Sequence, residues 1–90
     1  MKTFHLNIVT PAGHVFDNMV TFVSARGQEG SLGILGGHTP IVTLLKPGEV
    51  LIRQGKHDIG YDIGAGILEV NAEHNVVILT DFAREKQENH

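Results

Sequence analysis

Six histidines are the residues of this chain with the most evident capacity for chemistry, because imidazole binds metals and transfers protons near neutral pH. No two of them are spaced as HxH or HxxxH, and no carboxylate stands at a metal-ligand offset from any of them. A zinc site needs converging ligands, so the spacing predicts no metal site. Most of these side chains fall at turns or polar strand positions, which is typical of solvated imidazoles: His5, His14, His38, His57, His74 and His90.

Phosphate-binding and nucleophilic motifs are incomplete in the same way. A Walker A loop ending at Gly55-Lys56 would require glycine at position 50, where Val50 stands. Gly64-Ala65-Gly66 lacks the third glycine of a dinucleotide fingerprint. The chain has no cysteine, and neither serine has a Gly-x-Ser-x-Gly context. We therefore expect no catalytic residue, no cofactor and no metal. One enzymatic alternative stays open, a small β enzyme with His38 as base beside Asp58 or Asp62.

The elements that would position any site are short strands. The 90 residues contain 11 glycines and 3 prolines, which leave little room for helices. Residues 4–9 alternate apolar and polar side chains, and a hairpin is expected around Gly55. Residues 76–80 are apolar without alternation, which predicts a strand buried on both faces. We expect an all-β fold, a flattened β-sandwich of about ten short strands in a single domain over residues 1–83, with residues 84–90 as a polar tail or the start of a missing helical domain.

Charge and hydropathy argue against several classes of protein. The net charge is −3, from 7 basic and 10 acidic residues, so the chain lacks the basic footprint of a nucleic-acid binder. No apolar run approaches the roughly 20 residues needed to cross a bilayer. The absence of cysteine fits a cytosolic compartment, and the first residues show no apolar segment of a secretory signal.

With no chemical motif complete, the remaining candidate for function is a surface that binds a partner. Residues 27–40 hold five glycines among apolar side chains. Glycine lets another backbone approach closely, and exposed apolar patches usually mark a partner. This stretch is either a partner-binding surface or a tight crossover between strands.

Ordered motifs in and after this stretch resemble a known family, the N-terminal domain of the epsilon subunit of rotary F-type ATP synthases. The family pattern has Glu-Gly-x-Leu-Gly-Ile, then Gly-His-x-Pro, Leu-x-Pro-Gly, a Gly-rich turn before Leu-Glu-Val, and an apolar strand that ends in Asp. The matching residues here are 29–34, 37–40, 45–48, 64–70 and 76–81. The resemblance runs from about residue 4 to residue 83 in the right order.

The resemblance implies a non-catalytic rotor subunit of the central stalk, with the gamma subunit and the c-subunit ring as partners. By family position, Gln28, Glu29, Gly30 and Ser31 would face the ring. His38, Thr39, Pro40, Ile41, Val42 and Thr43 would face gamma. The chain would couple ion translocation to ATP synthesis and hydrolysis, and would associate with a membrane only through the complex. The expected location is the cytoplasmic face of a bacterial plasma membrane, with the stromal side of a plastid thylakoid membrane as the alternative. Weak self-association of the isolated chain is a further expectation.

Two departures from the family pattern affect these expectations. Gly36 stands where many relatives carry proline, which should loosen the turn by about 0.5–1 kcal/mol. The chain also stops where the family continues into two C-terminal helices, which carry an inhibitory switch and, in some bacteria, an ATP site. We expect neither function here. The competing interpretation of the whole chain is a stand-alone β-sandwich module that binds a ligand such as a peptide or a sugar.

Overall fold

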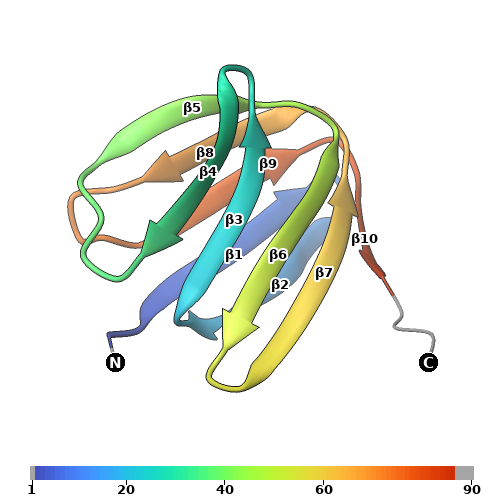
Figure 1. Cartoon of the computed structure of the whole chain (residues 1–90). Helices are drawn as coiled ribbons and strands as arrows, with labels where there is room; N and C mark the ends of the chain where they lie inside the picture. The colour runs from blue at the N-terminus through green and yellow to red at the C-terminus, as the bar shows by residue number, and fades with distance from the viewer. Residues whose placement is uncertain (1, 87–90) are drawn as a thin grey trace.

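Short strands make up all the regular structure of the chain in the computed structural model, which describes residues 2–86 (Figure 1). The all-β prediction is therefore confirmed. The strands are β1 (Phe4–Thr10), β2 (Gly13–Val20), β3 (Phe22–Gly27), β4 (Gly30–Leu35), β5 (Ile41–Leu45), β6 (Gly48–Gln54), β7 (His57–Ile63), β8 (Gly66–Val70), β9 (Val76–Thr80) and β10 (Ala83–Lys86).

The strands form two facing layers, as predicted for a sandwich (Figure 1). Their hydrogen-bonded order is β10-β7-β6-β3-β5-β8-β9-β1-β2, and β4 lies off this path, paired with β3. The path bends between β3 and β5, where a single residue pair, Gly27 with Leu45, joins the layers. On the other side, the backbone N–H of Thr21 donates to the Arg53 carbonyl at 2.8 Å and draws the β2–β3 corner against β6. The sandwich is consequently almost closed.

The core lies between the layers because alternate side chains of each strand point inward. In β1, Phe4, Leu6 and Ile8 are buried while the residues between them are only half-buried. The ring of Phe16 meets that of Tyr61 edge-on, with centroids 6.1 Å apart. Within residues 2–86, every buried side-chain nitrogen or oxygen has a hydrogen-bond partner. The remaining buried apolar residues are Val20, Val23, Ala25, Ile34, Leu45, Val50, Ile52, Ile63, Leu68, Val70, Val76 and Ile78.

Glycine has a clear conformational role at the β6–β7 turn. Gly55 has φ of 61°, a left-handed conformation that side-chain-bearing residues rarely adopt. It joins Gln54 to the paired His57, which confirms the predicted hairpin.

Two expectations from the sequence are corrected. Strand β9 is not buried on both faces, since Leu79 is 50% exposed while Ile78 is fully buried. The polar segment after Ala83 is not simply a tail: Arg84 to Lys86 belong to β10, which pairs with β7. An edge strand with a solvated outer face needs no apolar stripe, so its sequence carried no strand signal. Residues 87–90 of the predicted tail lie outside the described residues.

Candidate functional site

The β3–β4 hairpin presents the residues that the sequence assigned to the ring. Gln28 and Glu29 form its exposed two-residue turn between the paired Gly27 and Gly30. Gly30 has φ of 126°, a value that glycine tolerates best. The backbone N–H of Gln28 donates to the Leu44 carbonyl at 3.0 Å, which fixes the turn against the end of β5. The hairpin tip is thus a projecting but well-anchored feature.

The connection from β4 to β5 presents the first residues that the sequence assigned to gamma. Gly37 turns the chain with φ of 84°, and the His38 N–H donates to the Leu35 carbonyl at 3.2 Å. The His38 carbonyl is 2.9 Å from Nδ1 of His74, a residue of the β8–β9 turn with φ of 67°. A protonated Nδ1 of His74 donates this hydrogen bond. The connection is therefore tied to a turn far away in sequence.

The β4–β5 connection and the tip of the β3–β4 hairpin lie at opposite ends of β5 (Figure 1). The β4–β5 connection, with His38, leads directly into Ile41 at the start of the strand. The hairpin tip, with Gln28, is hydrogen-bonded to Leu44 near its end. Five residues of strand span roughly 14 Å. The structure therefore places His38 and the hairpin tip at opposite ends of β5, while Val42 and Thr43 of the stretch assigned to gamma lie on the strand between them.

Within the stretch assigned to gamma, the β5 side chains do not share one face. Val42 points outward and is 69% exposed. Ile41 and Thr43 are half-buried on the inner side, and Thr43 pairs with Leu68, whose side chain is in the core. Of the predicted β5 residues, Val42 alone is available for a contact on the outer face.

An apolar row that the sequence analysis missed crosses this outer face. Leu44 on β5 lies opposite Ile67 on β8, and Ile67 lies opposite Leu79 on β9. The three residues are 56%, 40% and 50% exposed, respectively. Val42 and Leu44 are next-but-one neighbours on the same face of β5, so Val42 extends the surface. We call Val42, Leu44, Ile67 and Leu79 the outer apolar face.

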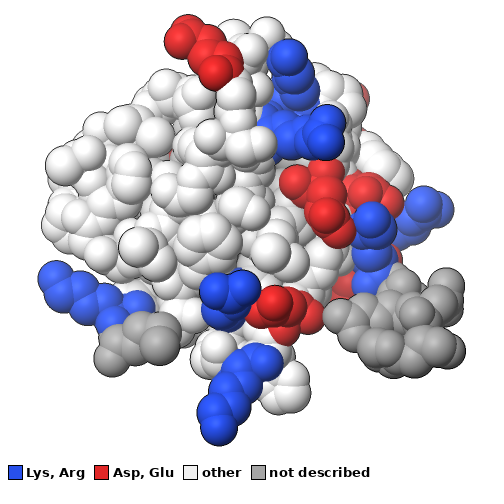
Figure 2. All heavy atoms as spheres, viewed as in Figure 1, with Lys and Arg blue, Asp and Glu red and all other residues white. Residues whose placement is uncertain are grey.

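The sequence carries a signal for this face, which at residues 76–80 was interpreted as burial on both faces. The runs around Leu44 and Leu79 are apolar at both inward and outward positions. Such a pattern indicates that both faces avoid water, without saying whether this chain or another covers the outer one. In the space-filling view, charged side chains gather on the β6–β7–β10 side and at the ends of the molecule (Figure 2). On the outer apolar face itself, the exposed Glu69 lies opposite Val42.

Ionisable groups form scattered surface pairs. Arg53 and Asp58 face each other across the β6–β7 hairpin, with Nε and Oδ1 at 2.9 Å. The hydrogen bond from Arg53 lowers the pKa of Asp58 and raises the pKa of Arg53. Burial raises the pKa of Tyr61, and the nearby Glu85 adds to the effect. These shifts fit structural pairs on the β6–β7–β10 side, away from the outer apolar face.

Residues 2–86 bring no three metal-ligating side chains together. Among them there is also no helix with the length and hydropathy to cross a membrane.

The fold is a small β-sandwich module whose exposed features are the β3–β4 hairpin tip, the β4–β5 connection and the outer apolar face. The family description that matches it is "ATP synthase, Delta/Epsilon chain, beta-sandwich domain", over residues 3–86. The chain belongs to this family, and the resemblance found in its sequence is confirmed.

Relatives of known name support the assignment. The chain is 40% identical over 88 residues to the ATP synthase epsilon chain of Priestia megaterium, covering 98% of this chain and 65% of that protein. It is 39% identical over 85 residues to the same chain of Bacillus thuringiensis, covering 94% and 63%. The chain thus spans just under two thirds of the length of these relatives.

Solved structures agree on the fold. A chain of the Euglena gracilis mitochondrial ATP synthase, from a structure described as OSCP/F1/c-ring in rotational state 1, superposes with a TM-score of 0.87 at 27% identity. The match covers 92% of this chain and 53% of that one. A chain of the Tetrahymena thermophila mitochondrial central stalk and c-ring superposes with a TM-score of 0.78 at 20% identity, which shows the shared fold alone.

Proposed function

We propose that the chain is a non-catalytic rotor component of an F-type ATP synthase, placed in the central stalk between the gamma subunit and the c-subunit ring. The observation that supports the proposal is the placement of the β3–β4 hairpin tip and the β4–β5 connection at opposite ends of β5, with the outer apolar face along that strand. An adaptor between a shaft and a ring needs two distinct surfaces on a stiff body. A β-sandwich supplies that stiffness because its side chains interlock at the density of organic crystals.

Gamma would contact the β4–β5 connection and the outer apolar face. His38, Thr39 and Pro40 are at least partly exposed, and Val42 is 69% exposed. Exposed leucine and isoleucine side chains in register across three strands are unusual on a surface that stays in water. Covering them with a subunit would remove apolar area from water, which favours a stable contact.

The ring would contact the β3–β4 hairpin through Gln28, Glu29, Gly30 and Ser31. These residues are exposed and project from the end of the sandwich opposite the β4–β5 connection (Figure 1). Polar residues on a hairpin tip suit a contact with polar loops. The chain would then follow rotation without taking part in bond making, at the cytoplasmic face of a bacterial plasma membrane or, as the alternative, at the stromal face of a plastid thylakoid membrane.

Cysteine crosslinking tests both placements in the assembled enzyme. We expect Ser31→Cys to crosslink to a cysteine in the polar loops of the ring, and His38→Cys to crosslink to gamma. Lys56→Cys, on the exposed β6–β7 turn, is the matched control and should crosslink to neither. The chain has no cysteine of its own, so each crosslink reports one position. Absence of both crosslinks in an active enzyme would reject the placement.

Reconstitution tests the function itself. Restoring the chain to a complex stripped of its epsilon subunit should restore the link between ion pumping and ATP turnover. Equal coupling with and without the chain would refute the proposal.

The alternative of a stand-alone sugar- or peptide-binding module has less support. Stacking on a sugar needs exposed aromatic rings. Of the five aromatic residues, Phe82 alone is exposed, at 47%, while Phe4 and Tyr61 are buried and Phe16 and Phe22 are half-buried.

A further inference from the structure

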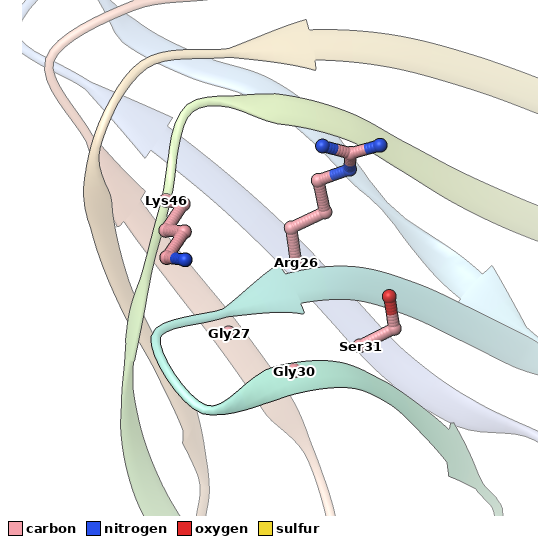
Figure 3. A pocket seen from close by; sticks show the side chains of 5 residues that line it. All are labelled: Arg26, Gly27, Gly30, Ser31 and Lys46. Atoms are coloured by element: carbon pink, nitrogen blue, oxygen red, sulfur yellow. The ribbon is translucent and has the colours of Figure 1, made fainter.

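A small depression lies at the base of the β3–β4 hairpin, where β5 leads into β6. It has a volume of about 150 Å³ and is lined by Arg26, Gly27, Gly30, Ser31 and Lys46. In Figure 3, the Lys46 side chain approaches from the β5–β6 connection, while the side chains of Arg26 and Ser31 rise from the two paired strands in the same direction. Two cationic groups and a hydroxyl therefore border one space.

Backbone contacts hold this arrangement in place. The Lys46 N–H donates to the Arg26 carbonyl at 2.8 Å, so the two cationic residues are fixed next to each other although 20 positions separate them. The aliphatic part of Arg26 lies across Gly48, where an added Cβ would stand 2.7 Å from Arg26 Cδ. Glycine at position 48 is thus what lets the Arg26 side chain lie across the rim of the depression.

The two cations are unsatisfied within the described chain. In residues 2–86, no carboxylate lies within ion-pair distance of Arg26 or Lys46. By contrast, Arg53 pairs with Asp58 at 2.9 Å, and Lys86 lies 3.3 Å from Glu49. In a chain with a net charge of −3, an adjacent pair of cations that forms no ion pair is a local excess of positive charge. Such an excess favours an anionic ligand.

We propose that this depression is an anion-binding site that receives a carboxylate side chain of the partner subunit at the β3–β4 hairpin. The inference deepens the proposed function and rests on it: the partner is the c ring, and an acidic residue of its polar loops is the ligand. Arginine binds carboxylates through paired N–H donors, lysine adds a point charge, and the Ser31 hydroxyl can donate a further hydrogen bond. These three side chains border one space, and together they supply the donors that a single carboxylate would need.

The charge of the hairpin favours a carboxylate over a phosphate group. Glu29 stands on the turn next to Gly30, so the hairpin carries one negative charge beside the two positive ones. The local excess of one positive charge is neutralised by a monoanion, whereas a dianionic phosphate would leave the site with a net negative charge. Basic side chains beside an acidic one are visible at the hairpin end of the molecule in Figure 2.

Binding of the chain to an ATP synthase complex stripped of epsilon tests the proposal. We expect Arg26→Gln and Lys46→Gln each to weaken binding about tenfold, with a shallower dependence on salt. Arg26→Lys, which keeps the charge, should retain most of the affinity. Lys56→Gln, an exposed lysine on the β6–β7 turn, is the matched control and should bind as the parent chain does. Thermal unfolding of each variant checks that it is folded.

The outcomes separate this inference from the proposed function. If the parent chain fails to bind the complex, the proposed function fails. If it binds and the folded Arg26→Gln/Lys46→Gln double variant binds equally well, the anion site is refuted. Titration of the parent chain with acetate and with inorganic phosphate tests the ligand class, read from the amide NMR signals of Gly27, Gly30 and Ser31. We expect acetate to shift them and the double variant to lose the response. A response to phosphate alone, or to neither anion, would overturn the carboxylate assignment.

Discussion

The outer apolar face gives the sharpest test of the proposed contact with gamma. The perturbation is the triple variant Leu44→Gln/Ile67→Gln/Leu79→Gln, which replaces the in-register row by polar side chains of similar length. These side chains already point to solvent in the isolated chain, so the fold should tolerate the change. Binding to gamma, in contrast, should become weaker.

The size of the effect follows from the exposed fractions. Leu44, Ile67 and Leu79 are 56%, 40% and 50% exposed, so about half of each side chain remains to be buried by a partner. Full burial of an aliphatic side chain contributes about 1.5–3 kcal/mol, so each residue should contribute about 1 kcal/mol and the row about 3 kcal/mol. A loss of about 3 kcal/mol corresponds to roughly a 100-fold weaker complex.

The assay is a titration of gamma, or of the gamma-containing complex, with the chain and its variants. Met19→Gln is the matched control, because Met19 is 47% exposed but lies on β2 at the edge of the sheet. It should bind gamma as the parent chain does. The single variant Leu79→Gln should weaken binding to gamma about fivefold. It keeps the test available if the triple variant does not fold. A folded triple variant with unchanged affinity, or an equal loss for Met19→Gln, would refute this use of the face.

Three further predictions concern the sandwich itself. In Gly66→Ala, the added Cβ would overlap the Leu79 carbonyl oxygen and push β8 from β9, so urea unfolding should show a loss of about 2–3 kcal/mol, and an unchanged midpoint would contradict this. The pKa of Tyr61 is raised on folding, so its contribution to stability is complete below about pH 10 and is lost as the pH rises through the raised pKa. In alkali, the unfolding midpoint should therefore fall more steeply with pH for the parent chain than for Tyr61→Phe. If the two midpoints fall in parallel, titration of Tyr61 is not the cause. Gly36→Pro should not give the increase in stability of about 0.5–1 kcal/mol expected for proline in a turn, because a Cβ at position 36 would stand 2.6 Å from Lys2 Cβ. In a Lys2→Gly background, thermal unfolding should show part of that increase. A full increase in the parent background would show that the N-terminal segment moves aside without cost.

Local pattern was sufficient to predict most of the fold. Alternation at Phe4, Leu6 and Ile8 identified the inward face of β1, because one side of that strand is covered by the core and the other is not. The glycine at position 55 identified its hairpin, because few other residues adopt that φ. In both cases the determining interaction lies within a few residues of chain.

The failures share a different cause. Two features depend on which elements lie beside a strand: the outward position of Leu79, and the pairing of Arg84 in β10 with Asp62. The alternation of side chains along a strand does not encode its neighbours. The adjacency of Arg26 and Lys46 depends on the β3–β5 junction, which joins segments far apart in the sequence. Family position therefore supplied the predicted interface residues, which stay a prediction, but gave no indication of the outer apolar face or the cationic pair.

That junction also bears on how rotation would pass through the chain. The layers are joined between β3 and β5 by one residue pair, Gly27 with Leu45, reinforced by the backbone hydrogen bonds of Gln28 with Leu44 and of Lys46 with Arg26. Under the proposed function, a force that enters at the hairpin tip reaches β5 through these few bonds. From β5 it spreads into β8 through five residue pairs, which underlie the outer apolar face. The narrowest joint of the sandwich would then lie directly beneath the ring contact, where a bound carboxylate between Arg26 and Lys46 would brace β3 against the β5–β6 connection.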